Sequence, residues 1–160
     1  MKKFIESAAV LLLLFAAVVL SGCEDSQAGE PVEPQLDVTP HNMAGSWAVS
    51  LWNGRRLDDE CYVYLSLDRR ERTFEMYDNL GSFSTRKVTG QYNIYTDEER
   101  GAMIRGVYDY GNGEWSHRYV VTSLTASQMV WRAADDDEVV TVYERVESIP
   151  DHIVNARTEQ

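Results

Sequence analysis

Cysteine is scarce in this 160-residue sequence, and the patterns that cysteine and histidine commonly form in enzymes are missing. Only Cys23 and Cys61 occur, and the three histidines, His41, His117 and His152, are scattered along the chain. No C-x-x-C, H-x-x-x-H, G-x-S-x-G or phosphate-loop motif is present. These absences argue against a disulfide framework and against zinc, hydrolase and nucleotide chemistry. We therefore expect no enzymatic activity, no cofactor and no metal site.

Positive charge is also scarce. The chain has 15 lysines and arginines against 26 aspartates and glutamates, which gives a formal net charge of −11. Its lysines are Lys2, Lys3 and Lys87 alone. Phosphate backbones and anionic lipid head groups repel a strongly acidic protein. We therefore expect no nucleic-acid partner, and any attachment to a membrane has to come from a lipid.

The apolar run at residues 8–20 is too short for a transmembrane helix, which needs about 20 apolar residues. Lys2 and Lys3 precede the run, as in a secretory signal peptide. The run ends in Leu20-Ser21-Gly22-Cys23, which resembles the lipobox of bacterial lipoproteins. This resemblance implies removal of residues 1–22 and acylation of Cys23 with fatty acids such as palmitate. The alternative is a secreted protein with a chance cysteine.

Residues 24–41 are rich in acidic residues and proline, and such a composition buries too little surface to fold. We expect residues 23–41 to form the lipidated cysteine and a flexible acidic tether. The folded domain should then span residues 42–147, followed by a tail at 148–160 with a short helical turn near Pro150. We expect a protein of the bacterial cell envelope, held by lipid at the outer membrane, with the side of that membrane left open.

From Gly45 onward, polar and apolar residues alternate with the period of two that is typical of β-strands. Turn residues such as Asn53-Gly54 separate the runs. The pattern predicts an all-β fold, an eight-stranded antiparallel up-and-down barrel, because closing a sheet removes its two free edges. A two-sheet sandwich is the alternative. The predicted strands are 45–52, 60–68, 72–78, 83–95, 102–110, 115–124, 128–134 and 138–145.

Cys61 lies on the same face of its predicted strand as Val63, Leu65 and Leu67. This position predicts a buried thiol that behaves as a small apolar side chain. A nucleophilic pair of Cys61 and His117 is the alternative, provided that the fold joins them.

Several stretches together resemble the lipocalin-like lipoproteins of bacteria, over about residues 44–146. They are the G-x-W sequence Gly45-Ser46-Trp47, residues 90–94, residues 124–131 and residues 141–146. The resemblance implies a single antiparallel barrel that is open at one end. It also implies that Trp47 closes the floor and that Arg145 lies across its ring. It implies no reaction, because function depends on the site rather than on the fold.

Two acidic clusters are predicted to meet at the mouth of such a barrel, because its first and last strands pair. Carboxylates gathered there could hold calcium or attract a cationic ligand, whereas solvated turns would need no ligand. The spacing of a calcium-binding loop is absent, which weakens the metal interpretation. The clustered residues are Asp58, Asp59, Glu60, Asp135, Asp136 and Asp137.

Aromatic residues are numerous, and they fit either a ligand pocket or a filled core. A small apolar or amphipathic ligand is the first hypothesis. The alternative is an interaction or inhibitor-like module with a filled barrel, which contacts another envelope protein through exposed aromatics such as Trp115. A cavity of at least about 300 Å³ would favour the ligand. The candidate pocket residues are Trp52, Tyr62, Tyr92, Tyr108, Trp131 and Tyr143.

Overall fold

The structure is a computed structural model that describes residues 33–82 and 84–156. The predicted signal segment and Cys23 lie outside the described residues. Within the described part of the chain, no helix is long and apolar enough to cross a membrane.

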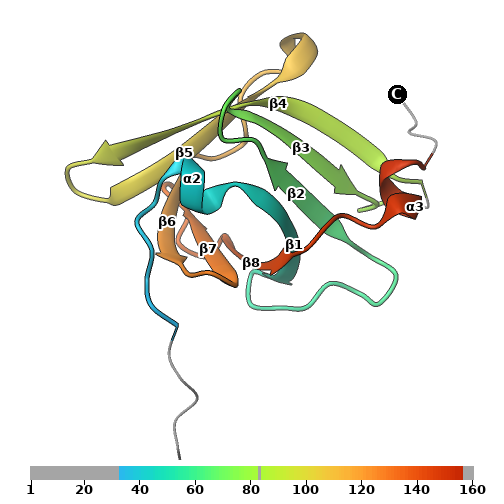
Figure 1. The fold of residues 1–160 in the computed structure, drawn as a ribbon, viewed down its shortest axis with the longest axis horizontal. Coiled ribbons are helices and arrows are strands. Elements are labelled where there is room, and N and C mark those ends of the chain that lie inside the picture. Colours follow the sequence, from blue (N-terminus) through green and yellow to red (C-terminus); the bar gives the residue numbers. More distant parts are fainter. Residues whose placement is uncertain (1–32, 83, 157–160) are drawn as a thin grey trace, which may run out of the picture. The chain divides into compact units, whose positions relative to one another are not determined.

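Eight antiparallel strands form a closed barrel, in which each strand pairs with its neighbours in sequence (Figure 1). The closing ladder joins the first and last strands, from Ser46 opposite Val146 to Trp52 opposite Thr141. This pairing confirms the predicted up-and-down barrel and excludes the sandwich. The strands are β1 (Gly45–Trp52), β2 (Val63–Leu67), β3 (Thr73–Asp78), β4 (Arg86–Asp97), β5 (Gly101–Tyr108), β6 (Tyr119–Leu124), β7 (Gln128–Ala133) and β8 (Val140–Val146).

The turn after β1 is fastened to the start of β8. Asn53 and Gly54 both have positive φ, of 50° and 75°, which suits asparagine and glycine. The Asn53 backbone N–H donates to the Val140 carbonyl at 2.7 Å, and its side-chain Oδ1 accepts from the Val140 N–H at 3.0 Å. These two bonds extend the closing ladder to the rim of the barrel.

Register shifts in β1 and β6 change which side chains face the interior. In β1 a shift between Val49 and Leu51 brings Trp52 opposite Thr141. Strict alternation from Val49 would have turned Leu51 inward, but the extra residue of a β-bulge reverses the order of faces. Trp52 therefore joins Val49 on the inner face. The shift in β6 falls between Val121 and Ser123.

Residues 33–41 contact the barrel, which corrects the expectation of a flexible tether up to residue 41. Leu36 donates its backbone N–H to the Leu124 carbonyl at 2.8 Å, and Glu33 accepts from the Ser127 hydroxyl at 2.8 Å. Leu36 and Val38 also pack against the core. The acidic and proline-rich composition of this segment suggested that it has too little apolar surface to fold. Burial of these two apolar side chains is nevertheless enough to hold it against the barrel.

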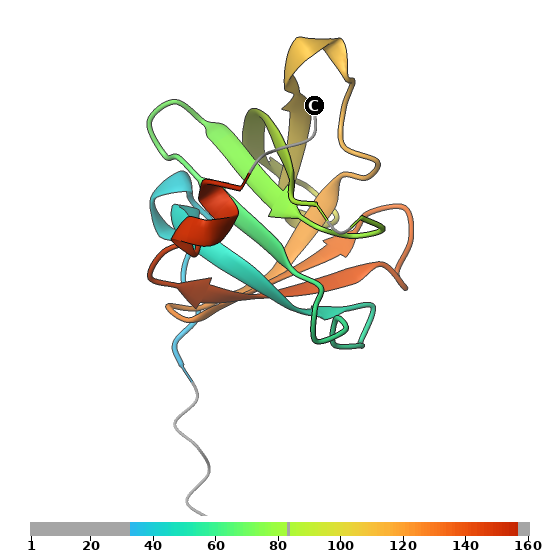
Figure 2. The same cartoon turned by 90° about the vertical axis from the view of Figure 1, so that its right-hand side faces the viewer.

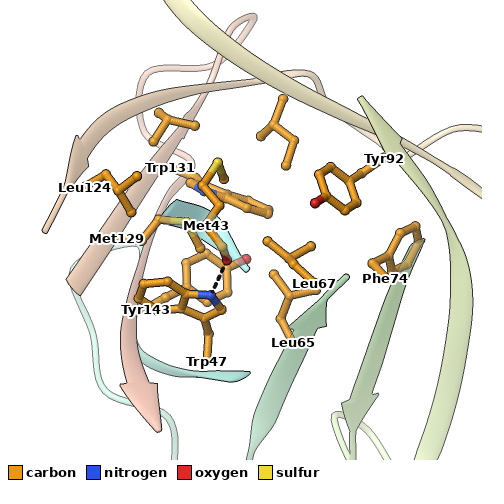
Figure 3. Packing of buried hydrophobic residues seen from close by; sticks show 12 residues of the cluster. Met43, Trp47, Leu65, Leu67, Phe74, Tyr92, Leu124, Met129, Trp131 and Tyr143 are labelled. Atoms are coloured by element: carbon orange, nitrogen blue, oxygen red, sulfur yellow. Dashed lines mark hydrogen bonds between the residues drawn. The ribbon is translucent and has the colours of Figure 1, made fainter. Parts of the chain in front are cut away.

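The short helix α2 (Pro40–Met43) closes the end of the barrel near these contacts. The Thr39 hydroxyl caps it by accepting from the Asn42 N–H at 3.2 Å. Met43 is fully buried, and its carbonyl accepts a 2.9 Å hydrogen bond from the Trp47 indole, drawn as a dashed line in Figure 3. Leu65 and Met129 converge on the same place from β2 and β7 (Figure 3).

A second apolar cluster lies on the outer face of β2 and β3. The C-terminal helix α3 (Asp151–Val154) lies on the outside of the barrel (Figure 2). Its Ile153 is buried with Ile149 against Tyr77. The helical turn expected near Pro150 is therefore present, and it covers the outside of the barrel.

Candidate functional site

The end of the barrel opposite α2 contains a cavity of about 390 Å³. The pairing of β1 with β8 shows which residues lie near the rim of this cavity and which lie deeper. Trp52 and Thr141 pair nearer the rim, Val49 and Tyr143 pair one layer deeper, and Trp47 lies below them. Seven aromatic side chains, beside aliphatic and polar ones, line the cavity. They are Trp52, Phe74, Tyr108, Trp115, Tyr119, Trp131 and Tyr143.

The aromatic rings contact one another in a series that runs from β3 to β8. Trp131 has ring centroids 4.8 Å from Tyr143 and 5.6 Å from both Trp115 and Tyr119. Phe74 meets Trp115 edge-on at 5.0 Å. Tilted and edge-to-face contacts of this kind favour a fixed arrangement of rings. The wall is therefore rigid and apolar.

Trp115 points into the barrel rather than outward, contrary to the interpretation that it is an exposed contact residue. It packs over Gly106, where an added side-chain carbon would lie 2.2 Å from the Trp115 ring. The backbone N–H of Trp115 also donates to the Gly106 carbonyl at 2.9 Å. A glycine in the middle of a strand often marks such a close approach, and that signal was available in the sequence.

Four of the six predicted pocket residues, Trp52, Tyr108, Trp131 and Tyr143, line the cavity. Tyr62 does not, because it precedes β2 and packs in the outer cluster, where its hydroxyl lies 2.6 Å from Thr85 Oγ1.

Tyr92 faces the interior but lies in the closed half of the barrel. It is buried, and its hydroxyl donates to the Asp68 carbonyl at 3.0 Å. Sequence periodicity could not separate these cases, because it gives neither the register nor the depth of a strand residue.

Charged residues of the rim form local pairs. Arg86, which lines the cavity, donates from Nε and Nη2 to Asp78 Oδ2 at 3.1 and 3.0 Å. His117 Nδ1 lies 2.8 Å from Asp135 Oδ1, and this hydrogen bond holds the pKa of Asp135 below its usual value. Sequence reasoning missed Arg86, since nothing in its pattern indicated a cavity position.

The tyrosine hydroxyls of the cavity lack hydrogen-bond partners among the described residues. Burial raises the pKa of Tyr108, Tyr119 and Tyr143. The phenols of Tyr119 and Tyr108 add to the rise in the pKa of Tyr143. The Trp131 indole nitrogen is also buried without a partner. The cavity therefore holds neutral donor groups that are not committed to the protein.

The predicted acidic mouth does not form one cluster. Asp135 is engaged by His117, and Asp137 accepts from Arg132 Nη1 at 2.8 Å. Asp136 accepts from the backbone N–H of Glu138 at 3.0 Å. The cluster Asp58, Asp59 and Glu60 is exposed in the loop between β1 and β2. Within residues 33–82 and 84–156, no three His, Cys, Asp or Glu side chains are grouped as metal ligands would be.

Trp47 and Arg145 lie at the closed end, as the sequence resemblance implied. The Arg145 guanidinium carbon is 4.0 Å from the centre of the Trp47 ring. Its three nitrogens donate to the carbonyls of Ala126, Ala44 and Asn42, each at 2.7 Å. The side chain thus ties the β6–β7 loop to the segment that precedes β1.

Cys61 lies in the loop before β2 rather than in the strand, and it is partly buried with a free thiol. Its backbone N–H donates to the Asp58 carbonyl at 2.8 Å. His117, its suggested partner, is hydrogen-bonded to Asp135.

Comparison with known proteins gives likenesses of fold. No family model and no curated protein matches the chain. A protein from Bacteroides uniformis ATCC 8492, solved by NMR, is 18% identical with a TM-score of 0.52, over 69% of this chain and 94% of that one. A lipocalin-like protein from the same organism, solved by crystallography, is 14% identical with a TM-score of 0.46, over 66% of this chain and 99% of that one.

Proposed function

We propose that this chain is a lipid-anchored protein of the bacterial cell envelope whose barrel binds one small apolar or amphipathic molecule. The observation that carries the proposal is the cavity of about 390 Å³ lined by aromatic rings. It exceeds the roughly 300 Å³ at which ligand pockets begin.

The anchor is proposed from the sequence ending in Cys23. One acyl chain binds a membrane only marginally, and two or more hold a protein stably. Residues 33–36 join the barrel at its closed end, through the contacts of Leu36 with Leu124 and of Glu33 with Ser127. Residues 33–36 thus leave the mouth open to a ligand.

An interaction module is the second candidate, and one residue favours it. Tyr110 is 96% exposed at the tip of the β5–β6 loop, in the short helix η1 (Asp109–Gly111). Tyrosine is enriched at the centre of protein interfaces. Replacing Tyr110 by alanine should abolish capture of an envelope partner if this candidate is right, and should leave ligand binding unchanged if it is wrong.

Native mass spectrometry of the full-length protein, purified gently from its own host, tests the ligand proposal. A non-covalent mass addition that disappears on denaturation supports it. The variant Val49→Trp, which fills the cavity, should lose this addition. Val107→Trp is the matched control, because Val107 is 47% exposed on the outer side of β5 and its variant should keep the addition. A wild-type protein without any bound molecule contradicts the proposal.

A further inference from the structure

The deep part of the cavity offers an unpartnered hydroxyl group and, among the residues that the structure describes, no uncommitted charge. Tyr143 is only 8% exposed and lines the cavity, and its hydroxyl has no partner among the described residues. Buried polar groups in proteins are nearly always hydrogen-bonded, so an unpartnered hydroxyl in a cavity wall indicates a ligand group.

We propose that the ligand is a neutral, ring-containing molecule with a carbonyl oxygen at its leading end, which accepts a hydrogen bond from the Tyr143 hydroxyl. This inference rests on the proposed function and names the class of molecule that the same cavity takes.

The neutrality of the ligand follows from the charges around the cavity. The Arg86 guanidinium is paired with Asp78, which is 1% exposed, and His117 is paired with Asp135. Among the described residues, an anion in the cavity would find no free cation beside it, and a cation would find no free carboxylate there. Burying an unpaired charge costs far more than burying a hydrogen-bonded carbonyl. The net charge of −11 further disfavours the approach of an anion.

The carbonyl follows from the balance of donors and acceptors. The Asp78 carboxylate, which is the strongest acceptor near the cavity, already accepts from Arg86 and from the Leu80 backbone N–H at 3.2 Å. The phenol of Tyr143, which lines the cavity, remains as a donor. An acceptor oxygen on the ligand pairs with it, whereas a hydrocarbon leaves it unpaired.

The ring follows from the shape of the wall. Trp115, Trp131 and Tyr119 form a contiguous surface with ring centroids 5.6 to 6.2 Å apart. A flat aromatic ligand can stack on such rings at offset or edge-on angles, which adds to the gain from burial.

Equilibrium dialysis with three probes of similar shape tests the inference. Methyl naphthyl ketone carries the carbonyl, isopropenylnaphthalene replaces that oxygen by a methylene group, and naphthoate is the anion. The full chain with Cys23→Ala is used, alone and with Tyr143→Phe. Tyr64→Phe is the matched control, since Tyr64 packs in the outer cluster. Thermal melting of each variant checks that the barrel is intact.

The ketone should bind about tenfold more tightly than the alkene, the gain expected from one buried hydrogen bond. Tyr143→Phe should remove that preference by weakening the ketone alone, and Tyr64→Phe should preserve it. Equal binding of ketone and alkene overturns the carbonyl assignment but leaves the proposed function standing. Tighter binding of naphthoate than of the ketone overturns the neutrality of the ligand. Failure of all three probes overturns the inference, whereas the proposed function is overturned by a wild-type protein that carries no bound molecule in native mass spectrometry.

Discussion

Removal of the Arg145 side chain should destabilise the barrel more than any other loss of a surface charge. The side chain makes three 2.7 Å hydrogen bonds to backbone carbonyls and stacks on Trp47 at 4.0 Å. A hydrogen bond from a charged group contributes about 1.5–3 kcal/mol, and a cation–π contact about 0.5–2 kcal/mol. Arg145 is partly exposed, so water replaces part of these interactions in the variant. We expect Arg145→Ala to lower the free energy of unfolding by about 3 kcal/mol.

Urea unfolding followed by circular dichroism measures this loss, and a fall in Tm of about 10 °C should accompany it. Arg145→Lys should lie between the wild type and the alanine variant, because lysine keeps the charge over the indole but lacks the planar fork of donors. Arg132→Ala is the control. It removes a single exposed ion pair with Asp137, worth about 1 kcal/mol or less.

An Arg145→Ala variant that unfolds at the same urea concentration as Arg132→Ala would refute this reasoning. It would mean that water stabilises the three carbonyls and the Trp47 ring as much as the guanidinium does. If residues 1–23 are the export signal that we propose, the variant should be processed as the wild type is.

Three further outcomes are expected. Cys23→Ala should move the protein from the membrane fraction to the soluble fraction in cell fractionation, and continued sedimentation with membranes would remove the anchor proposal. Gly90→Ala should destabilise the barrel strongly in urea unfolding, because the added carbon would lie 2.1 Å from the Val107 carbonyl oxygen, while a loss below about 1 kcal/mol would contradict that geometry. Burial raises the pKa of several tyrosines above the usual 10.0, so the folded chain keeps protons that the unfolded chain releases near that pH. The free energy of unfolding should therefore be intact below pH 10.0 and fall as the pH rises above it, which urea titrations and the ultraviolet absorbance of tyrosinate can follow. The tyrosines concerned are Tyr92, Tyr108, Tyr119 and Tyr143.

Much of the fold could be predicted because its signals are local. Alternation within each run and turn residues such as Asn53-Gly54 located all eight strands to within a few residues at most ends. Two of the larger differences lie at the starts of β2 and β6, at Val63 and Tyr119 rather than at Glu60 and Trp115. In both places, alternation continues into a loop that leaves the ladder. The position of Arg145 over Trp47 came from the family resemblance rather than from alternation.

The candidate site was predictable only in part. Tyr108, Trp131 and Tyr143 line the cavity as predicted, and Trp52 does so because a bulge reverses the faces of β1. The prediction that Tyr62 lines the pocket was wrong, because β2 starts after this residue. Neither the bulge in β1 nor the start of β2 can be predicted from the residues of one strand alone.

The sequence by itself determined the class of fold, since period-two alternation and turn chemistry act between residues that are close in the chain. Only the tertiary structure decided that the interior holds a cavity and that Trp115 turns inward over Gly106. It also decided that residues 33–41 pack on the barrel. The physical reason is that these features depend on the register and depth of strands distant in sequence, where a shift of one residue exchanges the inner and outer faces.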